Sequence, residues 1–204
     1  MPTTAERGRQ VRRRLITAAA ELIGERGWSA VSTRTLAERA GVGPGLVHYH
    51  FASLQALRIE AAAQMMSAVA EGATARLETA ADAEEGLALI IRDLDRFSGD
   101  DPMSRLFIEA YLASTRDEEL RRAISGVLEL FRSRLTAWLA TAGVEAPEET
   151  ARVLGAALDG VMLHRALDPG LTSGVVEPML RRLLAPTPVS DRTDGHEEQR
   201  QGDR

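Results

Sequence analysis

Apolar residues recur with the period of an α-helix along most of the chain. Between Gln10 and Arg26 they return at steps of three and four residues, so one face of a predicted helix is apolar, and Gly27 ends it. This stripe consists of Leu15, Ile16, Ala19, Leu22 and Ile23. Runs of β-branched residues are scarce, whereas Ala, Leu, Glu and Arg dominate. The pattern therefore predicts an all-α protein.

Two short helices with a tight turn between them follow this first helix. One is predicted over residues 33–40, with a Ser or Thr before it as N-cap, and it stops at Gly41. The other is predicted over Gly45–His50, because the fixed φ of Pro44 suits a first helical turn and its missing N–H needs no partner there. Together with the amphipathic helix, they predict a helix-turn-helix. The expected core is Ile16, Ala19, Ile23, Val31, Leu36, Ala40, Val42, Val47 and Phe51.

The remainder of the chain is predicted to be helical as far as residue 185. Ser53 is the expected N-cap of a long connecting helix that continues to about Leu77. Five further helices are predicted at Ala83–Phe97, Pro102–Arg116, Glu118–Ala142, Pro147–Leu167 and Thr172–Leu184. From Pro186 onward almost no residue is apolar, which predicts a disordered tail. We therefore expect a first domain at 1–52, a second helical domain at 53–185 and a tail at 186–204.

The composition narrows the class of protein further. Apolar residues make up 44% and charged residues 27%, as in globular proteins, and the absence of Cys excludes disulfide scaffolds, thiolate metal sites and cysteine nucleophiles. We expect neither a metal nor a cofactor. No window approaches the roughly 18 uncharged apolar residues of a membrane span, and no apolar signal segment opens the chain. These features predict a soluble, cytoplasmic protein that does not bind a membrane.

Charge is distributed unevenly along the chain. The net charge is −5, but residues 1–60 hold nine Arg against five acidic residues, a net charge of +4, which leaves −9 for the rest. A basic segment attached to an acidic body indicates two modules with different partners, and nucleic acid is the expected partner of the basic one.

Residues 11–58 carry the features that identify a family. These are the apolar first helix, the Gly27 stop, Thr33–Ala37, Ala40–Val42, and Val47–Phe51 followed by Ser53, Ala56 and Leu57. In order and spacing this segment resembles the DNA-binding domain of the tetracycline-repressor (TetR) family of bacterial regulators. The resemblance implies a C-terminal helical domain that binds a small ligand and forms a homodimer. One departure is Leu54, where many members have a Lys that contacts a phosphate.

The resemblance and the exposed face of the second short helix suggest the DNA contacts. That face carries Gly45, Leu46, His48, Tyr49 and His50. Tyr49 and His50 are expected at phosphates and His48 at bases, whereas Gly45 and Leu46 could act only through thymine methyl contact or DNA shape. Thr33 is a helix cap, a phosphate contact or both.

Basic residues nearby offer further candidate contacts. Arg34 is expected at a base or a phosphate. Arg12 and Arg13 belong to a basic N-terminal arm that either reaches DNA or is an ordinary solvated cluster; cations in a first helical turn would oppose the helix dipole.

The second domain contains candidates for a ligand cavity and a dimer interface. The expected cavity lining is Phe97, Phe107, Tyr111, Trp138, Met162 and His164, although packing in the core is the usual role of such aromatic stripes, including that of Phe131. The expected dimer interface is Gly155, Ala156, Asp159, Gly160, Leu163, Val176, Leu180 and Leu183. Asp159 interrupts an apolar run and could serve either the interface or the cavity.

These observations favour a homodimeric transcriptional regulator, more specifically a repressor. It would bind an inverted-repeat DNA operator and be released by a small, largely hydrophobic molecule. A transcriptional activator of the same fold and an all-helical protein-interaction module without DNA binding are the alternatives. An enzyme is not expected, because His48 and His50 lie on the DNA face, only His164 and His196 remain, and no Gly-rich phosphate loop or nucleophile motif is present.

Overall fold

The computed structural model describes residues 3–185, and all regular structure within them is helical. The helices are α1 (Thr4–Arg26), α2 (Thr33–Ala40), α3 (Gly45–His50), α4 (Leu54–Leu77), α5 (Ala83–Leu94), α6 (Pro102–Ser114), α7 (Glu118–Thr141), α8 (Pro147–His164) and α9 (Ser173–Leu180), with 3₁₀ turns at Trp28–Ala30 and Arg181–Leu183. The all-α prediction is confirmed. Within this part of the chain, no helix is both long and apolar enough to cross a membrane.

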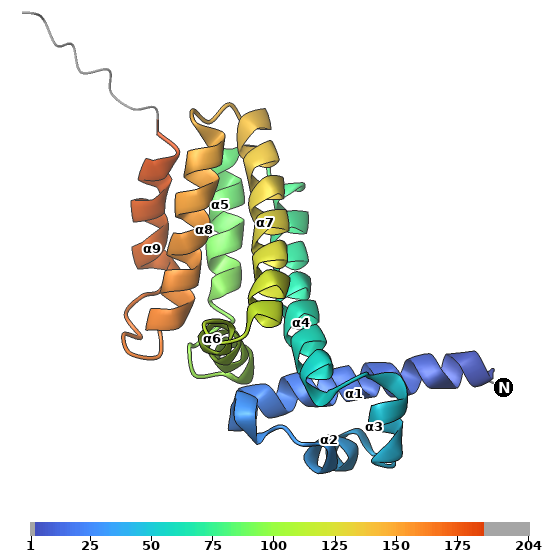
Figure 1. Cartoon of the computed structure of the whole chain (residues 1–204). Coiled ribbons are helices and arrows are strands. Elements are labelled where there is room, and N and C mark those ends of the chain that lie inside the picture. Colours follow the sequence, from blue (N-terminus) through green and yellow to red (C-terminus); the bar gives the residue numbers. More distant parts are fainter. Residues whose placement is uncertain (1–2, 186–204) are drawn as a thin grey trace, which may run out of the picture.

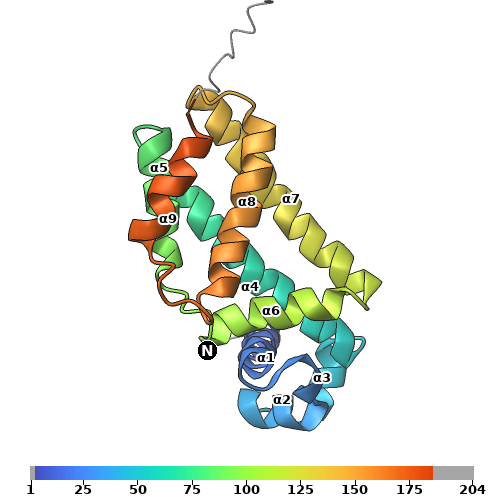
Figure 2. The same ribbon diagram turned by 90° about the vertical axis from the view of Figure 1, so that its left-hand side faces the viewer.

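The helices form a small unit at one end of the molecule and a larger bundle above it (Figure 1). Helices α1, α2 and α3 make the small unit, and α4 leads from it into the bundle, where it packs along α7. Helix α6 lies crosswise between the bundle and α1 (Figure 2). The predicted tail at 186–204 lies outside the described residues.

Two hydrophobic cores hold these parts together. The first is built on the α1–α3 unit, but it continues through Leu57 of α4 into Leu106 and Ala110 of α6 and Leu120 of α7. The second lies higher in the bundle, between α5, α7, α8 and α9. Because the first core crosses the expected boundary at residue 52, the small unit packs directly onto the base of the bundle.

Helix α1 begins earlier than predicted. Thr3 and Glu6 form a capping box, in which the Thr3 hydroxyl accepts from the Glu6 N–H and the Glu6 carboxylate accepts from the Thr3 N–H, so the helix starts at Thr4 and not at Gln10. The prediction of an N-terminal arm is therefore wrong for residues 4–14, which are helical. The arginines at 12–14 lie in the interior of α1, away from its first turn.

The other helix starts agree with their local signals. The Ser53 hydroxyl accepts from the Ala56 N–H at 3.0 Å and caps α4, and Asp101 caps α6 ahead of Pro102. The helix ends come slightly earlier than predicted: α5 stops at Leu94, for example, because the chain turns there to reach α6.

Candidate DNA interface and ligand cavity

Local sequence signals build the turn that presents α3. Ser32 caps α2, since its hydroxyl accepts from the Thr35 N–H at 3.2 Å. Gly41 ends α2 with φ 63°, a left-handed conformation that favours glycine. Val47 is 1% exposed and anchors the inner face of α3, whereas Tyr49 on the outer face is 79% exposed. The sequence therefore fixes which side of α3 is free.

The structure brings the predicted α3 residues together on this free side. Gly45, Leu46, His48 and Tyr49 are exposed and His50 is half-buried. The rings of Tyr49 and His50 meet edge to face, with centroids 5.0 Å apart. This six-residue helix thus offers a short surface of hydroxyl and imidazole groups of the size that fits a DNA major groove.

Two predicted contacts on α2 remain accessible. Thr33 is the first residue of α2, and because Ser32 provides the cap, the Thr33 hydroxyl is not needed for that role. Arg34 is exposed, and its Nε donates to Glu38 at 2.9 Å across one helical turn. A fully exposed pair of this type contributes little to stability, so it does not hold the guanidinium away from another anion.

Arg12 has a different role from the one predicted. Its two terminal nitrogens donate to the carboxylate of Glu60 on α4 at 2.5 and 2.6 Å, and its guanidinium lies 4.8 Å from the centre of the Phe51 ring. This bidentate pair ties α1 to α4, so Arg12 is a structural residue and the prediction of a DNA contact is corrected. Arg13 is exposed and lines an open groove between α1 and Arg39 of α2.

Two polar contacts and one close backbone contact form a junction between the small unit of α1–α3 and helices α4 and α6. The Glu109 carboxylate of α6 accepts from the Trp28 N–H at 2.7 Å, and Arg58 of α4 donates to the Trp28 carbonyl at 3.0 Å. At Gly24 of α1 a Cβ would lie 2.1 Å from the carbonyl oxygen of Pro102, so α1 and α6 touch at a point where only glycine fits. A shift of α6 would therefore move α1.

A predominantly apolar cavity of about 80 Å³ lies in the bundle between α4, α5, α6, α7 and α8. Its lining consists of Met66, Val69, Ala70, Ala73, Ile90, Leu94, Phe97, Phe107, Val127, Leu128, Phe131, Leu158, Asp159 and Met162. Three of the predicted residues line it: Phe97, Phe107 and Met162. The long helix after residue 53 was expected to form one wall, but its lining residues were not named, although those at 66, 69, 70 and 73 have the spacing of one helix face.

The other three predicted ligand contacts do not line this cavity. Tyr111 is 70% exposed on the outside of α6. Trp138 packs in the second core, where it occupies the space that a side chain at Gly86 would need: a Cβ there would lie 2.2 Å from the indole ring. His164 is exposed, and its Nδ1 lies 2.8 Å from the Gly160 carbonyl oxygen. Each residue lies on a helix face that turns away from the cavity.

Phe97 is held at the cavity by a buried arginine that the sequence did not reveal. Arg165 at the end of α8 donates to the carbonyls of Phe97 at 3.2 Å and Leu171 at 2.7 Å, to that of Leu94, and to the Asp95 carboxylate at 2.8 Å. This network joins the ends of α5 and α8. It spans about 70 residues of sequence, so no local pattern could show it.

Asp159 is the one ionisable residue of the cavity lining. The residue as a whole is exposed, but the protein atoms on its cavity side partly desolvate its carboxylate and raise the pKa of Asp159 to about 6. Of its two predicted roles, the structure agrees with that of a cavity residue, and its assignment to the dimer interface stays a prediction.

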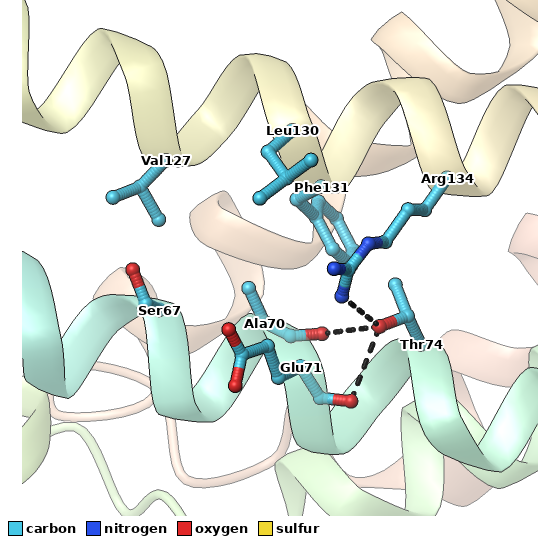
Figure 3. A pocket seen from close by; sticks show the side chains of 8 residues that line it. All are labelled: Ser67, Ala70, Glu71, Thr74, Val127, Leu130, Phe131 and Arg134. Carbon is cyan, nitrogen blue, oxygen red and sulfur yellow. Dashed lines mark hydrogen bonds between the residues drawn. The ribbon is translucent and has the colours of Figure 1, made fainter.

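A smaller and more polar pocket opens between α4 and α7 (Figure 3). Arg134 donates to the Thr74 hydroxyl at 3.5 Å, and this hydroxyl in turn donates to the carbonyls of Ala70 and Glu71. The pocket shares Ala70, Val127 and Phe131 with the larger cavity. We call this small pocket the α4–α7 seam. Phe131 lies between it and the apolar cavity.

The outer faces of α8 and α9 carry exposed apolar residues. On α8 and just after it they lie at Val153, Ala156, Leu163 and Leu167, with the half-buried Gly160 between them at the same steps of three and four, and α9 adds Val175 and Met179. Of the predicted interface residues, Ala156, Gly160 and Leu163 belong to this face.

Four predicted interface residues lie elsewhere. Val176 is buried in the second core, Leu180 and Leu183 pack against it, and a Cβ at Gly155 would face Phe131 at 4.0 Å. These four residues therefore pack within the subunit and not on the exposed face.

An exposed helix-turn-helix joined to a helical bundle with an apolar cavity defines a DNA-binding regulator with an effector domain. Residues 78–186 match the family model described as the tetracyclin repressor-like C-terminal domain, and residues 15–61 match that of the bacterial regulatory proteins of the tetR family. The chain belongs to the TetR family of transcriptional regulators. It is accordingly a regulator and not an enzyme, and the alternative of an interaction module without DNA binding is set aside.

Individual relatives agree with this assignment. The chain is 29% identical over 160 residues to the HTH-type transcriptional regulator BetI of Rhizobium meliloti strain 1021, a match that covers 76% of this chain and 78% of the relative. The structure of the transcriptional regulator SCO7518 from Streptomyces coelicolor A3(2) is similar with a TM-score of 0.73 at 28% identity, over 87% of this chain and 99% of that one. The multidrug binding protein EbrR, solved with imidazole, is similar with a TM-score of 0.64 at 30% identity, over 88% and 97% of the two chains.

Proposed function

We propose that this protein is a homodimeric repressor that binds an inverted-repeat operator through its two copies of α3. A compact, largely apolar molecule in the cavity releases it from DNA. The observation that carries this proposal is the position of α6, which supplies Phe107 to the cavity wall and Glu109 to the junction with Trp28.

The free face of α3 supports the DNA-binding part of the proposal. Tyr49 and His50 at the end of the helix are placed to contact phosphates, and His48 to reach base edges, while Thr33 and Arg34 of α2 flank them. Leu54 supplies no cation at the start of α4, so Arg13 and Arg34 are the nearby positive charges proposed for the phosphate backbone.

The apolar stripe of α8 supports the dimer. Monomeric proteins seldom leave a continuous row of large apolar side chains exposed, and Leu163 and Leu167 are 47% and 85% exposed here. Ala156 and Gly160 are small, and no heavy atom of residues 3–185 beyond the helix's own backbone lies within 4 Å of a Cβ at Gly160, so a second α8 could approach closely. We assign the dimer contact to this stripe and to Val175 and Met179 of α9, around a twofold axis.

The junction supports the switch. A ligand beside Phe107 that displaces α6 would move Glu109 and Pro102 against α1, and with them the separation of the two α3 helices in the dimer. The coupling required is about 1–3 kcal/mol, equivalent to a 5- to 150-fold change in DNA affinity.

The dimer and the operator can be tested together with two glycine variants. Gly160→Arg places a charged side chain on the proposed contact, whereas Gly126→Arg on the exposed side of α7 makes the same change where no neighbouring atom lies within 4 Å. We expect Gly160→Arg to sediment as a monomer and to lose at least tenfold in affinity for an inverted repeat identified by genomic footprinting. Gly126→Arg should behave as the unmodified protein.

A third variant separates the DNA face from the dimer. Tyr49→Ala should remain dimeric but bind all duplexes more weakly, because a phosphate contact carries no sequence information. A dimeric Gly160→Arg variant, or unchanged DNA binding by Tyr49→Ala, would contradict the proposed interfaces.

A further inference from the structure

The cavity combines apolar walls with a single carboxylate. Asp159 is the only acidic or basic side chain in the lining, and among residues 3–185 no cation lies near enough to affect its pKa, whose shift is caused by desolvation alone. The residue is exposed, but its carboxylate borders the cavity, where protein atoms partly desolvate it and no cation among the described residues compensates it. A positively charged occupant of the cavity would supply this missing partner.

The aromatic residues of the cavity favour the same kind of occupant. Phe107 and Phe131 are half-buried and line the cavity from α6 and α7. Phe131 also faces Gly155, one helical turn before Asp159 on α8, so its ring and the carboxylate belong to the same part of the wall. The third ring, Phe97, is already paired with the guanidinium of Arg96 at 5.4 Å. The face of an aromatic ring attracts cations, especially those without a strongly held hydration shell.

We propose that the cavity binds a compact organic cation of the alkylammonium class, with its charge beside Asp159 and its alkyl groups against Phe107 and Phe131. This inference rests on the proposed function, because it names the class of molecule that acts as the effector. Since a water-sized group needs about 10–15 Å³ of free space, a cavity of about 80 Å³ has room for roughly half a dozen non-hydrogen atoms without rearrangement.

An anionic occupant would have to bind on the other side of Phe131. The positive charge there belongs to Arg134, which lies in the α4–α7 seam and outside the lining of the apolar cavity (Figure 3). An anion in the cavity itself would face Asp159 and be repelled, so the charge of the ligand discriminates between the two sites.

Three probes that share a compact branched methyl surface test the sign of the charge. Tetramethylammonium is cationic and has four methyl groups, whereas the neutral tert-butanol and the anionic, slightly larger pivalate have three each. Calorimetric titration of the full chain at pH 7.5 should show that tetramethylammonium binds at least tenfold more tightly than either other probe. Equal affinity for the neutral probe, a preference for pivalate, or no binding of tetramethylammonium would overturn the proposal.

Two charge-removing variants locate the site. Asp159→Asn is expected to weaken tetramethylammonium at least tenfold and to leave tert-butanol unchanged. Glu145→Gln removes the same charge from an exposed residue of the α7–α8 loop, outside the cavity lining, and should bind as the unmodified protein does. A thermal melt of each variant checks that it is folded. Unchanged tetramethylammonium binding by folded Asp159→Asn would overturn the assignment.

A pH series gives a second readout that does not depend on a variant. Because the pKa of Asp159 is about 6, protonation should weaken tetramethylammonium binding about tenfold between pH 7.5 and pH 5. The same series with Asp159→Asn should be flat, which separates Asp159 from Glu71 and Arg134 of the seam and His164 of α8.

The test also distinguishes this inference from the proposed function. If tetramethylammonium binds through Asp159 but leaves operator affinity unchanged, the cation site stands and the switch fails. If the operator is bound and tetramethylammonium is not, the repressor stands and the cation site fails.

Discussion

The DNA-binding unit and the bundle use their apolar residues in opposite ways. In the α1–α3 unit, Leu36, Ala19 and Ile23 are fully buried and fill a small core around α3. In the bundle, Phe107 and Phe131 remain half-buried because the helices that carry them enclose a cavity. Filled cores favour stability and a fixed shape, whereas a preserved cavity gives up packing energy in exchange for a binding site. The same substitution should therefore have different effects in the two regions.

The largest effect is expected from truncating the filled core. Leu36→Ala should lower the free energy of unfolding by about 2–5 kcal/mol, because Leu36 has no exposed surface and its removal leaves a void. Leu46→Ala on the exposed face of α3 is the matched control, with an expected change within about 0.5 kcal/mol. Urea unfolding measures both. Similar losses for the two variants would mean that the core around α3 is not packed as described.

A smaller effect, opposite in the two regions, is expected from enlarging an alanine. Ala19→Leu in the filled core should cost about 1–3 kcal/mol by overpacking. Ala70→Leu points the same added atoms into the cavity, so its stability should stay within about 1 kcal/mol or increase, while binding of tetramethylammonium should be lost. An Ala70→Leu variant as unstable as Ala19→Leu would show that the cavity is not available space.

The smallest effect concerns the charge in the cavity wall. The pKa of Asp159 is raised in the folded protein, so folding is favoured by its protonated form, and this contribution is lost as pH rises through about 6. Asp159→Asn should therefore melt at a higher temperature than the unmodified protein at pH 8, and the difference should shrink towards pH 4. Glu145→Gln should show no such trend. A constant difference between pH 4 and pH 8 would contradict desolvation of this carboxylate.

The difference between the α1–α3 unit and the bundle also explains how much of the structure the sequence could predict. The helix-turn-helix follows from adjacent residues such as Ser32, Gly41 and Pro44, and the structure agrees with it. The first turns of α1 were missed because they carry no stripe of large apolar residues, and only the Thr3–Glu6 capping box marks their start. The role of Arg12 depends on Glu60, which is 48 residues away.

The cavity was harder to predict because it depends on which helix faces meet. Phe131 and Trp138 lie two turns apart on α7 and belong to similar apolar stripes. Only Phe131 reaches the cavity, since Gly86 of α5 leaves a space that Trp138 fills. Nothing in the sequence near either residue distinguishes them. Asp159 could be singled out as an interruption of an apolar run, but its position between the cavity and the α8 stripe required the fold.

The central claim is that the cavity and the operator face are thermodynamically linked through α4 and α6. Titrating tetramethylammonium into the dimer with and without saturating operator DNA tests this most directly, because linkage requires each ligand to weaken the other by the same factor. The account predicts an affinity about 5- to 150-fold lower for the operator complex, with an equal loss of operator affinity in saturating tetramethylammonium. Tetramethylammonium bound equally tightly in the presence and absence of operator would contradict it.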